Sequence, residues 1–321
     1  MGRLDGRVAI VTGSARGIGR GVALQLAAEG ASVVVADFGG ALDGTGGDRG
    51  PSDEVVSTIT KAGGRAIASY GDVSKFDDCK ATVDRALAEF GRLDILCHVA
   101  GILRDRMVFN MTEEEWDAVL AVHLKGAFNS VRTAVEPMLR QRYGRILLFS
   151  SGSGLGSPGQ ANYSAAKEGM VGFSRALARE LGPHGIAVNA IYPGGQTRMS
   201  ASVPTNRDQL RQRSGMAAAT TSTTIPYMME ETKLSGSPRD PDNNAPPVAW
   251  LCSEAGGMVS GQVIGTAGWQ ASRYTVRGVI RSISAPRRWS VEELSDIVPN
   301  HLAAGIPNPA PSTVREGAPA S

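Results

Sequence analysis

The stretch Thr12-Gly13-Ser14-Ala15-Arg16-Gly17-Ile18-Gly19 lies between an apolar run at residues 7–12 and a helical pattern at residues 18–29. Glycine permits a tight turn and lets backbone N–H groups approach a ligand closely. The N-terminus of the following helix adds about half a positive charge, so the turn is suited to a pyrophosphate. Glycine turns also serve packing alone, but a strand before and a helix after favour phosphate binding.

Outward from this turn, short apolar runs alternate with longer amphipathic ones up to about residue 195. Apolar runs without polar alternation are typical of strands buried on both faces. The pattern predicts an α/β fold with a doubly wound, Rossmann-type parallel sheet. The predicted strands are residues 7–12, 32–37, 65–69, 93–99, 145–150 and 186–191. The predicted helices are residues 18–29, 53–62, 76–90, 113–140, 163–181 and 248–253.

Three stretches depart from this alternation. Residues 39–51 form a Gly- and Asp-rich insertion after the second predicted strand. Residues 197–247 are rich in Ser, Thr, Met and Pro, and we expect this long irregular segment to be a substrate lid. Residues 271–321 form an Arg-bearing extension, whose last residues are expected to be disordered. The sequence thus predicts one catalytic domain, residues 1–270, followed by the extension.

The composition argues against several classes of protein. A chain of 321 residues, 42% hydrophobic and 20% charged, suits one large α/β domain. A net charge of +2 gives no support for a nucleic-acid partner, and no apolar run approaches the length of a membrane span. The three cysteines, Cys79, Cys97 and Cys252, have no metal-ligand spacing and are expected to be reduced thiols. With no signal segment at the start, we expect a cytoplasmic protein without a metal site.

Asp37 ends the second predicted strand, 24 positions after Gly13. An acid at this place in a dinucleotide-binding unit accepts hydrogen bonds from the adenosine ribose. A carboxylate also repels a 2′-phosphate, so Asp37 predicts NAD rather than NADP. The alternative is an aspartate that only caps the turn. Arg16 could stabilise a phosphate and argues in the opposite direction.

Tyr163 and Lys167 are four positions apart at the start of a predicted helix, on the same face and one turn apart. A free tyrosine has a pKa of about 10, and lowering it to about 7 takes about 4 kcal/mol. A neighbouring ammonium group supplies part of that stabilisation. The pair is therefore a candidate for proton transfer, although a chance pairing on a helix is the alternative. Ser151, after the fifth strand, could hydrogen-bond a substrate oxygen at the same edge of the sheet.

With these residues in place, residues 5 to about 268 resemble the short-chain dehydrogenase/reductase family. The matching motifs are residues 12–19, Asp72-Val73, Ala100-Gly101, the set Ser151, Tyr163 and Lys167, and Pro193-Gly194. The resemblance implies an NAD-dependent oxidoreductase in which Tyr163 transfers the proton. Lys167 would bind the nicotinamide ribose and lower the tyrosine pKa, and Ser151 would orient the substrate oxygen.

The resemblance also implies a set of cofactor contacts. Asp72 would contact adenine, Ala100 and Gly101 would pass beside the ribose, and Thr197 would hold the diphosphate. The complete expected set is Gly13, Ser14, Arg16, Gly17, Ile18, Gly19, Asp37, Asp72, Val73, Ala100, Gly101, Tyr163, Lys167, Pro193, Gly194 and Thr197. Family members are commonly homo-oligomers, so we expect one here.

Residues 100–106, 122–126, 159–167 and 265–269 resemble the (3R)-hydroxyacyl-CoA dehydrogenase module of the peroxisomal multifunctional β-oxidation enzyme and its free-standing bacterial relatives. The implied substrate is a 3-hydroxyacyl-CoA with a fatty or steroid-derived chain. The arginines of the extension could bind CoA phosphates or form a solvated basic surface: Arg273, Arg277, Arg281, Arg287 and Arg288. The alternatives are a dehydrogenase of free steroids or other alicyclic alcohols, and a catalytically idle NAD-binding scaffold.

Three positions depart from the family pattern. His98-Val99 replaces a pair of asparagines that braces the central strands, and His123 stands where the family places its catalytic asparagine. His123 could hold a water chain to Lys167 or could be a packing residue. Ser151 lies 12 positions before Tyr163, one fewer than is common, so Ser150 is a second candidate for the catalytic serine.

Overall fold

The computed structural model describes residues 2–199, 234–275, 282–284, 290–298 and 300–302. Contacts divide the chain into two units, Met1–Tyr274 and Thr275–Ser321. The described part of the second unit contains one helix, α9 (Val291–Ile297). Its N-terminus is closed by a capping box between Ser290 and Glu293, in which each side chain accepts from the other residue's backbone N–H.

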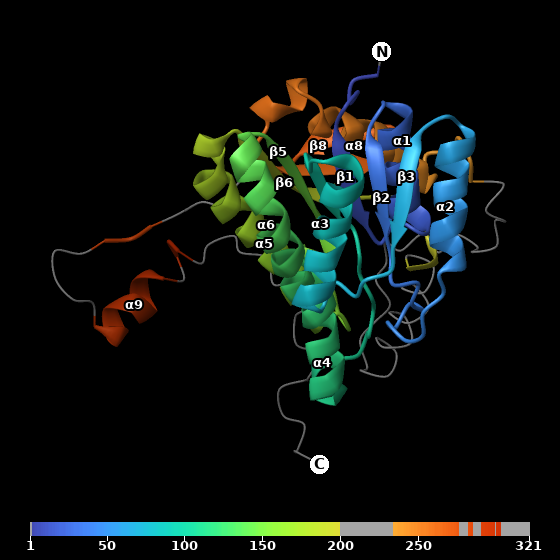
Figure 1. Cartoon of the computed structure of the whole chain (residues 1–321). Coiled ribbons are helices and arrows are strands. Elements are labelled where there is room, and N and C mark those ends of the chain that lie inside the picture. The colour runs from blue at the N-terminus through green and yellow to red at the C-terminus, as the bar shows by residue number, and fades with distance from the viewer. Residues whose placement is uncertain (1, 200–233, 276–281, 285–289, 299, 303–321) are drawn as a thin grey trace. The chain divides into compact units, whose positions relative to one another are not determined.

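The first unit is built on one sheet with the strand order β3-β2-β1-β4-β5-β6-β7-β8, and helices cover both of its faces (Figure 1). All neighbours pair in parallel except β7 and β8, which are antiparallel. The strands are β1 (Val8–Thr12), β2 (Ser32–Ala36), β3 (Arg65–Ser69), β4 (Ile95–His98), β5 (Gly144–Phe149), β6 (Ile186–Pro193), β7 (Val263–Ala267) and β8 (Gln270–Arg273). The predicted doubly wound α/β fold is confirmed.

Two layers of helices enclose the sheet because successive strand residues point to opposite faces. Val11 and Val33 pack with α1, α2 and α8, whereas Ile10 and Val34 pack with α3, α5 and α6. Burial on both faces explains why the central strands lack polar alternation. The helices are α1 (Gly17–Ala28), α2 (Gly50–Lys61), α3 (Phe76–Phe90), α4 (Glu113–Leu120), α5 (Gly126–Gln141), α6 (Ala161–Leu181) and α8 (Ala245–Cys252).

The uninterrupted α-helix predicted over residues 113–140 is wrong in one respect. Between α4 and α5 the chain makes a π-helical turn, Ala121–Lys125, and the helix then continues to Gln141. The wider turn carries His123, whose side chain is completely buried. Turns of this kind recur at functional sites. This one could not be predicted from the sequence, because it contains no glycine or proline.

The sequence patterns also missed β7 and β8 and placed the start of the last predicted helix three residues too late. β7 is short and contains Gly265, and every residue of β8 is exposed, so neither has a buried apolar run. Within the range 197–247, residues 200–233 lie outside the described part of the chain. At its far end, a 3₁₀ turn (Pro241–Asn244) leads into α8, which begins at Ala245 and not at residue 248. The first unit includes β8 and therefore ends at Tyr274, four residues beyond the predicted boundary.

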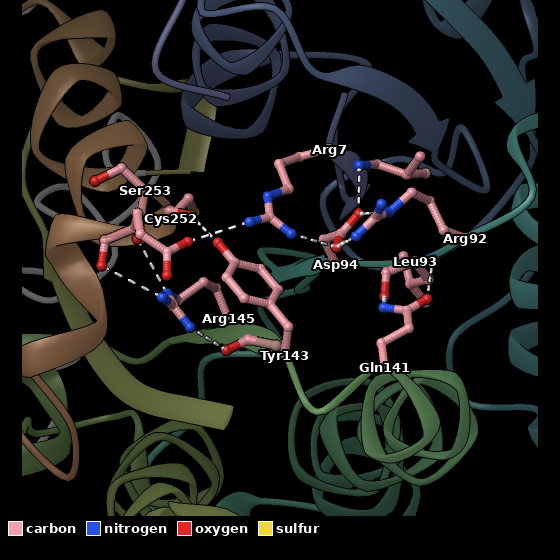
Figure 2. A network of polar contacts seen from close by, with 12 residues as sticks. Arg7, Arg92, Leu93, Asp94, Gln141, Tyr143, Arg145, Cys252 and Ser253 are labelled. Carbon is pink, nitrogen blue, oxygen red and sulfur yellow. Dashed lines mark hydrogen bonds and ion pairs between the residues drawn. The ribbon is translucent and has the colours of Figure 1, made fainter. Parts of the chain in front are cut away.

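At the amino ends of the strands, Asp94 is the centre of a polar network (Figure 2). Its completely buried carboxylate accepts hydrogen bonds from Arg92 at 2.7 and 2.8 Å, from Arg7 at 3.2 Å and from the Val8 N–H at 2.9 Å. These contacts connect the chain entering β1 to the chain entering β4.

A third arginine extends this network to the C-terminal part of the first unit. Arg145, 4% exposed, donates to the carbonyl oxygens of Ser253 and Glu254 at 3.1 and 3.4 Å. Its guanidinium lies 4.3 Å from the centre of the Tyr143 ring, and that of Arg7 lies 3.7 Å from the same centre. The amino edge of the sheet is thus held together by charged and aromatic groups, which leaves the carboxyl edge for the site.

Candidate active site

A cavity of about 950 Å³ opens at the carboxyl ends of the strands. It lies where the strand order reverses between β1 and β4, the usual ligand position in an open α/β sheet. Its wall includes most of the predicted site residues: Gly13, Arg16, Gly17, Ile18, Gly19, Asp37, Asp72, Val73, Ala100, Gly101, His123, Tyr163, Lys167, Pro193 and Thr197. Among the described residues, Ser14, Ser151 and Gly194 are predicted site residues that do not belong to this wall.

Two glycines of the turn, Gly13 and Gly19, have no room for a side chain. Gly13 has a positive φ of 65°, and a Cβ there would lie 2.7 Å from the backbone of Ala100. A Cβ on Gly19 would lie 2.1 Å from the Gly13 carbonyl oxygen. Ser14 is completely buried, and its hydroxyl donates to the Val11 carbonyl at 2.7 Å. The turn therefore presents backbone to the cavity, and the Ser14 side chain holds the turn in place.

Asp37, just after β2, both caps its turn and lies in the cavity wall. One carboxylate oxygen accepts from the Gly39 N–H at 2.7 Å, and the other accepts from the Ala15 N–H at 2.9 Å. A carboxylate has about four acceptor positions, so two remain for hydroxyl groups. The two readings of Asp37, turn cap and ribose ligand, are thus compatible.

Thr12 at the end of β1 holds the chain at His98-Val99, where the family pattern has a pair of asparagines. The Thr12 hydroxyl oxygen accepts from the N–H groups of Val99 and Ala100 at 3.0 and 3.2 Å. His98 is completely buried, with its Nδ1 3.3 Å from the Thr12 hydroxyl and 3.2 Å from that of Ser130. Burial lowers the pKa of His98 to about 3, so its ring is neutral at physiological pH.

Tyr163 and Lys167 lie one turn apart on α6, both nearly buried at 8% and 4% exposure. The Lys167 amine lies 5.4 Å from the centre of the Tyr163 ring and donates to the Phe149 carbonyl at 2.5 Å. Burial lowers the pKa of Lys167 to about 7. A phenolate on Tyr163 would favour the ammonium form and be stabilised by it, so the two protonation states are linked.

The two candidate serines differ in how their hydroxyls are engaged. Ser150 lines the cavity, but its buried hydroxyl donates to the Lys167 carbonyl at 2.6 Å. Ser151 caps the short 3₁₀ turn Gly152–Leu155, and its hydroxyl oxygen accepts from the Ser153 N–H at 3.1 Å. The Ser151 hydroxyl hydrogen is not used in that bond. Ser151 therefore retains a hydrogen for a ligand, although it lies outside the cavity wall, whereas the hydrogen of Ser150 is bonded to the Lys167 carbonyl.

His123 braces the chain that follows β4. Its Nε2 lies 2.8 Å from the Ile102 carbonyl oxygen and 3.1 Å from the Ile102 nitrogen. Its ring meets that of Tyr163 edge to face at 5.0 Å, and a Cβ on Gly101 would lie 2.2 Å from the His123 Cε1. Burial lowers the pKa of His123 well below its usual value. The ring packs against Tyr163 and Gly101, and its burial favours the neutral form.

Sequence reasoning missed the part of the wall that comes from the insertion after β2. Ala41, Leu42 and Asp43 line the cavity, and the Leu42 and Asp43 carbonyls accept from the Leu103 N–H and the Arg104 side chain at 2.9 and 3.1 Å. The insertion follows directly after Asp37, and this position was the available signal. Asp240 and Asp242 also line the cavity, and no pattern in the irregular 197–247 segment marked them.

The remaining predictions concern charge, metal and membrane. Arg273 is exposed in β8, and Arg277, Arg281, Arg287 and Arg288 lie outside the described residues. Within the described ranges, no three His, Cys, Asp or Glu side chains are grouped as a metal site. No helix in the described part of the chain has the length and apolarity to cross a bilayer.

Comparison with known proteins agrees with this geometry. The peroxisomal multifunctional enzyme type 2 of Drosophila melanogaster is 38% identical over 277 residues, which are 86% of this chain and 41% of the relative. This chain thus spans about two fifths of that relative. The 3-oxoacyl-(acyl-carrier-protein) reductase FabG of Staphylococcus aureus is 38% identical over 257 residues, 80% of this chain and 94% of the reductase.

A solved structure and a family model complete the comparison. A short chain dehydrogenase from Mycobacterium paratuberculosis, bound to NAD, has a TM-score of 0.73 and 30% identity over 83% of this chain and 98% of its own. The short chain dehydrogenase family model matches residues 7–208. The resemblance to the dehydrogenase module of the multifunctional enzyme is confirmed, and the chain belongs to the short-chain dehydrogenase family of oxidoreductases.

Proposed function

We propose that this chain is an NAD-dependent dehydrogenase that oxidises the hydroxyl of a 3-hydroxyacyl-CoA or reduces the matching ketone. The observation that carries the proposal is that one cavity contains Asp37, Tyr163 and Lys167. An acceptor for ribose hydroxyls and a proton-transfer pair are the two functions that such a reaction requires of the protein.

The residues of the cavity fit a dinucleotide. The backbone cradle at Gly13 and Gly19, where a Cβ would collide with neighbouring backbone, allows close approach of a pyrophosphate. Asp37 would accept from the ribose hydroxyls, and its charge favours NAD over NADP. The Mycobacterium paratuberculosis structure, bound to NAD, supports this choice. When bound, NAD would supply the acceptor for the hydride.

The chain's own residues would handle the proton. In the oxidation direction, the Tyr163 phenolate takes the proton of the substrate hydroxyl, and the carbonyl forms as the C–H hydrogen leaves with its electron pair. In reduction, the Tyr163 hydroxyl returns that proton. Lys167 stabilises the phenolate by its charge, and the Ser151 hydroxyl donates a hydrogen bond to the substrate oxygen in both states. His123 supports the Tyr163 ring by packing.

The substrate class rests on the relatives. Residues 100–106, 122–126, 159–167 and 265–269 resemble the hydroxyacyl-CoA dehydrogenase module, and FabG is named for a 3-oxoacyl substrate. Both point to a thioester with oxygen at C3. Arg198 in the cavity wall suits the anionic phosphates of CoA, whereas Arg104 in the same wall is paired with Glu114 at 3.3 Å.

We further propose a cytoplasmic homo-oligomer. The free, buried thiols of Cys79, Cys97 and Cys252 suit a reducing compartment. Val108 and Phe109 are each 68% exposed, and exposed apolar side chains of this size are typical of association surfaces.

The test is NADH formation from NAD and a panel of (3R)- and (3S)-hydroxyacyl-CoAs, steroid acyl-CoAs and free steroids. Rapid turnover of a CoA ester, lost in Tyr163→Phe, supports the proposal and identifies the acyl chain. Turnover of free steroids alone would assign the alternative substrate class. No turnover across the panel, with NAD still bound, would support the idle scaffold.

A further inference from the structure

The loop between β2 and α2, residues 37–49, places the carboxylate of Asp48 beside a cation of the cavity wall, although Asp48 itself does not belong to that wall. The Asp48 carboxylate lies 3.5 Å from the guanidinium of Arg16. Arg16 lines the cavity within the glycine turn, where an arginine could bind a phosphate. Asp48 therefore pairs with the Arg16 guanidinium, which would otherwise be available to an anionic ligand.

The position of Asp48 is set by the loop backbone and not by its ion pair. The Asp48 N–H donates to the Gly39 carbonyl at 3.1 Å, and the Asp48 Oδ1 accepts from the Gly50 N–H at 3.0 Å. Gly39 has a positive φ of 78°, and a Cβ there would lie 2.0 Å from the Asp48 carbonyl oxygen. Only a residue without a side chain lets the two backbones come so close.

The same loop joins this pair to Asp37. Asp37 accepts from the N–H of Gly39, which holds Asp48, and from the N–H of Ala15, the residue before Arg16. One carboxylate thus fixes both the arginine and its partner by backbone bonds. Asp37 is connected to the segments that carry Arg16 and Asp48 by hydrogen bonds to their backbone, and Arg16 and Asp48 form an ion pair.

We propose that Asp48 is a specificity-determining residue that excludes a 2′-phosphate from the adenosine ribose, by pairing with Arg16. The inference rests on the proposed use of NAD and adds a residue from the insertion to Asp37. A phosphate monoester carries about −1.5 to −2 charges at neutral pH. To bind it, Arg16 must leave Asp48, and the phosphate must then approach a carboxylate that the loop holds in place.

A purely stabilising role does not account for the pair. The side chains of Arg16 and Asp48 are 35% and 63% exposed, and exposed ion pairs contribute little to folding. An exposed pair is still effective against a ligand of the same sign as Asp48, because the ligand and the carboxylate compete for one guanidinium.

The test measures the effect of the 2′-phosphate on binding, independently of the catalysed reaction. Affinities of 5′-AMP and adenosine 2′,5′-bisphosphate, which differ only in the 2′-phosphate, are measured by calorimetry, together with those of NAD and NADP. The proteins are wild type, Asp48→Asn, Arg16→Gln and the double variant. Asparagine keeps the Oδ1 that accepts from Gly50. Asp84→Asn on α3 is the matched control, because Asp84 is also exposed and paired, with Lys80.

We expect Asp48→Asn to tighten binding of the bisphosphate and NADP by about threefold to fivefold at low salt, and to leave 5′-AMP and NAD within about twofold. The gain should disappear in the Arg16→Gln background, which is the signature of coupling between the two side chains. Asp84→Asn should leave the affinities for all four ligands unchanged.

Two outcomes would overturn the inference. In one, Asp48→Asn leaves the bisphosphate affinity unchanged. In the other, the gain is the same with and without Arg16, which would mean a general charge effect. The proposed cofactor choice is judged separately, by whether the wild-type protein prefers NAD to NADP.

Discussion

Lys167 and Phe149 are joined by a hydrogen bond of 2.5 Å from the lysine amine to the carbonyl at the end of β5. A second hydrogen bond joins the same two segments, because the hydroxyl of the neighbouring Ser150 donates to the Lys167 carbonyl at 2.6 Å. Two reciprocal bonds therefore fix the start of α6 to the last strand residue before the site. Because Tyr163 lies on α6, these bonds also fix the position of Tyr163. Ser150 and Phe149 are therefore positioning residues for Tyr163 and Lys167.

Replacing Tyr163 with phenylalanine should reduce kcat by about 10³-fold, because the proton loses its carrier. The ring and its edge-to-face contact with His123 remain, so the dissociation constant for NAD should stay within about twofold. Turnover and calorimetry measure the two quantities on one preparation. Substantial residual kcat would mean that another group transfers the proton.

Ser151→Ala and Ser150→Ala form a matched pair that assigns the catalytic serine. Ser151→Ala should lower kcat by about 10²-fold, as the loss of one hydrogen-bond donor to a reacting oxygen does, and should lower the melting temperature slightly, because the hydroxyl also caps the short 3₁₀ turn Gly152–Leu155. Ser150→Ala should cost about 1 kcal/mol of stability, since it removes a buried hydrogen bond. Steady-state kinetics and denaturant unfolding of both variants give the answer, and the reverse pattern would assign the role to Ser150.

His98 should make the protein sensitive to acid. Its pKa is about 3 in the native state and 6.5 when exposed, because burial disfavours the charged ring. Between pH 6.5 and pH 3, His98 is therefore protonated in the unfolded chain and neutral in the native protein. The free energy of unfolding that is present above pH 6.5 is lost as the pH falls toward 3. At pH 5 the loss is about 2 kcal/mol.

His98→Asn should reduce the drop in unfolding free energy between pH 7 and pH 5, whatever its cost at pH 7. The exposed His184 provides the control, as His184→Asn should leave that drop as it is in wild type. Urea titrations at both pH values measure it. An identical drop in all three proteins would show that His98 does not carry the acid sensitivity.

Asp94→Asn should destabilise the protein by about 3 kcal/mol, toward the lower end for a broken buried ion pair. Arg7 and Arg92 are 26% and 40% exposed, so water can partly take the place of the carboxylate. Equilibrium unfolding in urea measures the loss. Because the network lies at the amino edge of the sheet (Figure 2), the KM values of the folded variant should equal those of wild type.

The parallel core of the sheet was predicted correctly, because six apolar strands that alternate with helices can form few folds other than a parallel sheet covered by helices. β7 and β8 were missed because β7 has a glycine and a threonine among its buried residues and β8 has no buried residue. Gly268, with a φ of +58°, starts the two-residue turn between them, and a glycine in that place is a hairpin signal. The exposed residues of β8 belong to the sheet only through backbone bonds, which no side-chain pattern records.

The candidate site divides in the same way. Gly13, Asp37, Tyr163 and Lys167 carry motif spacing that places them at one edge of a parallel sheet, and the cavity contains all four. The distinction between Ser150 and Ser151 depends on where each hydroxyl hydrogen goes, which spacing cannot tell. The π-helical turn at His123 and the wall built by Leu42 and Asp43 depend on tertiary contacts between distant segments.

The Arg145 network sets an order of events during synthesis. The guanidinium of Arg145 is buried and finds acceptors at Ser253 and Glu254, more than a hundred residues later in the chain. A nascent polypeptide that has emerged only as far as α6 lacks both of these acceptors, and the guanidinium then has only the Gly144 carbonyl, at 2.9 Å in the folded chain, among its three carbonyl partners. The contacts of Arg145 are therefore complete only after the segment that follows α8 has emerged. Fragments cut before residue 253 are therefore expected to require a chaperone or to accumulate as aggregates.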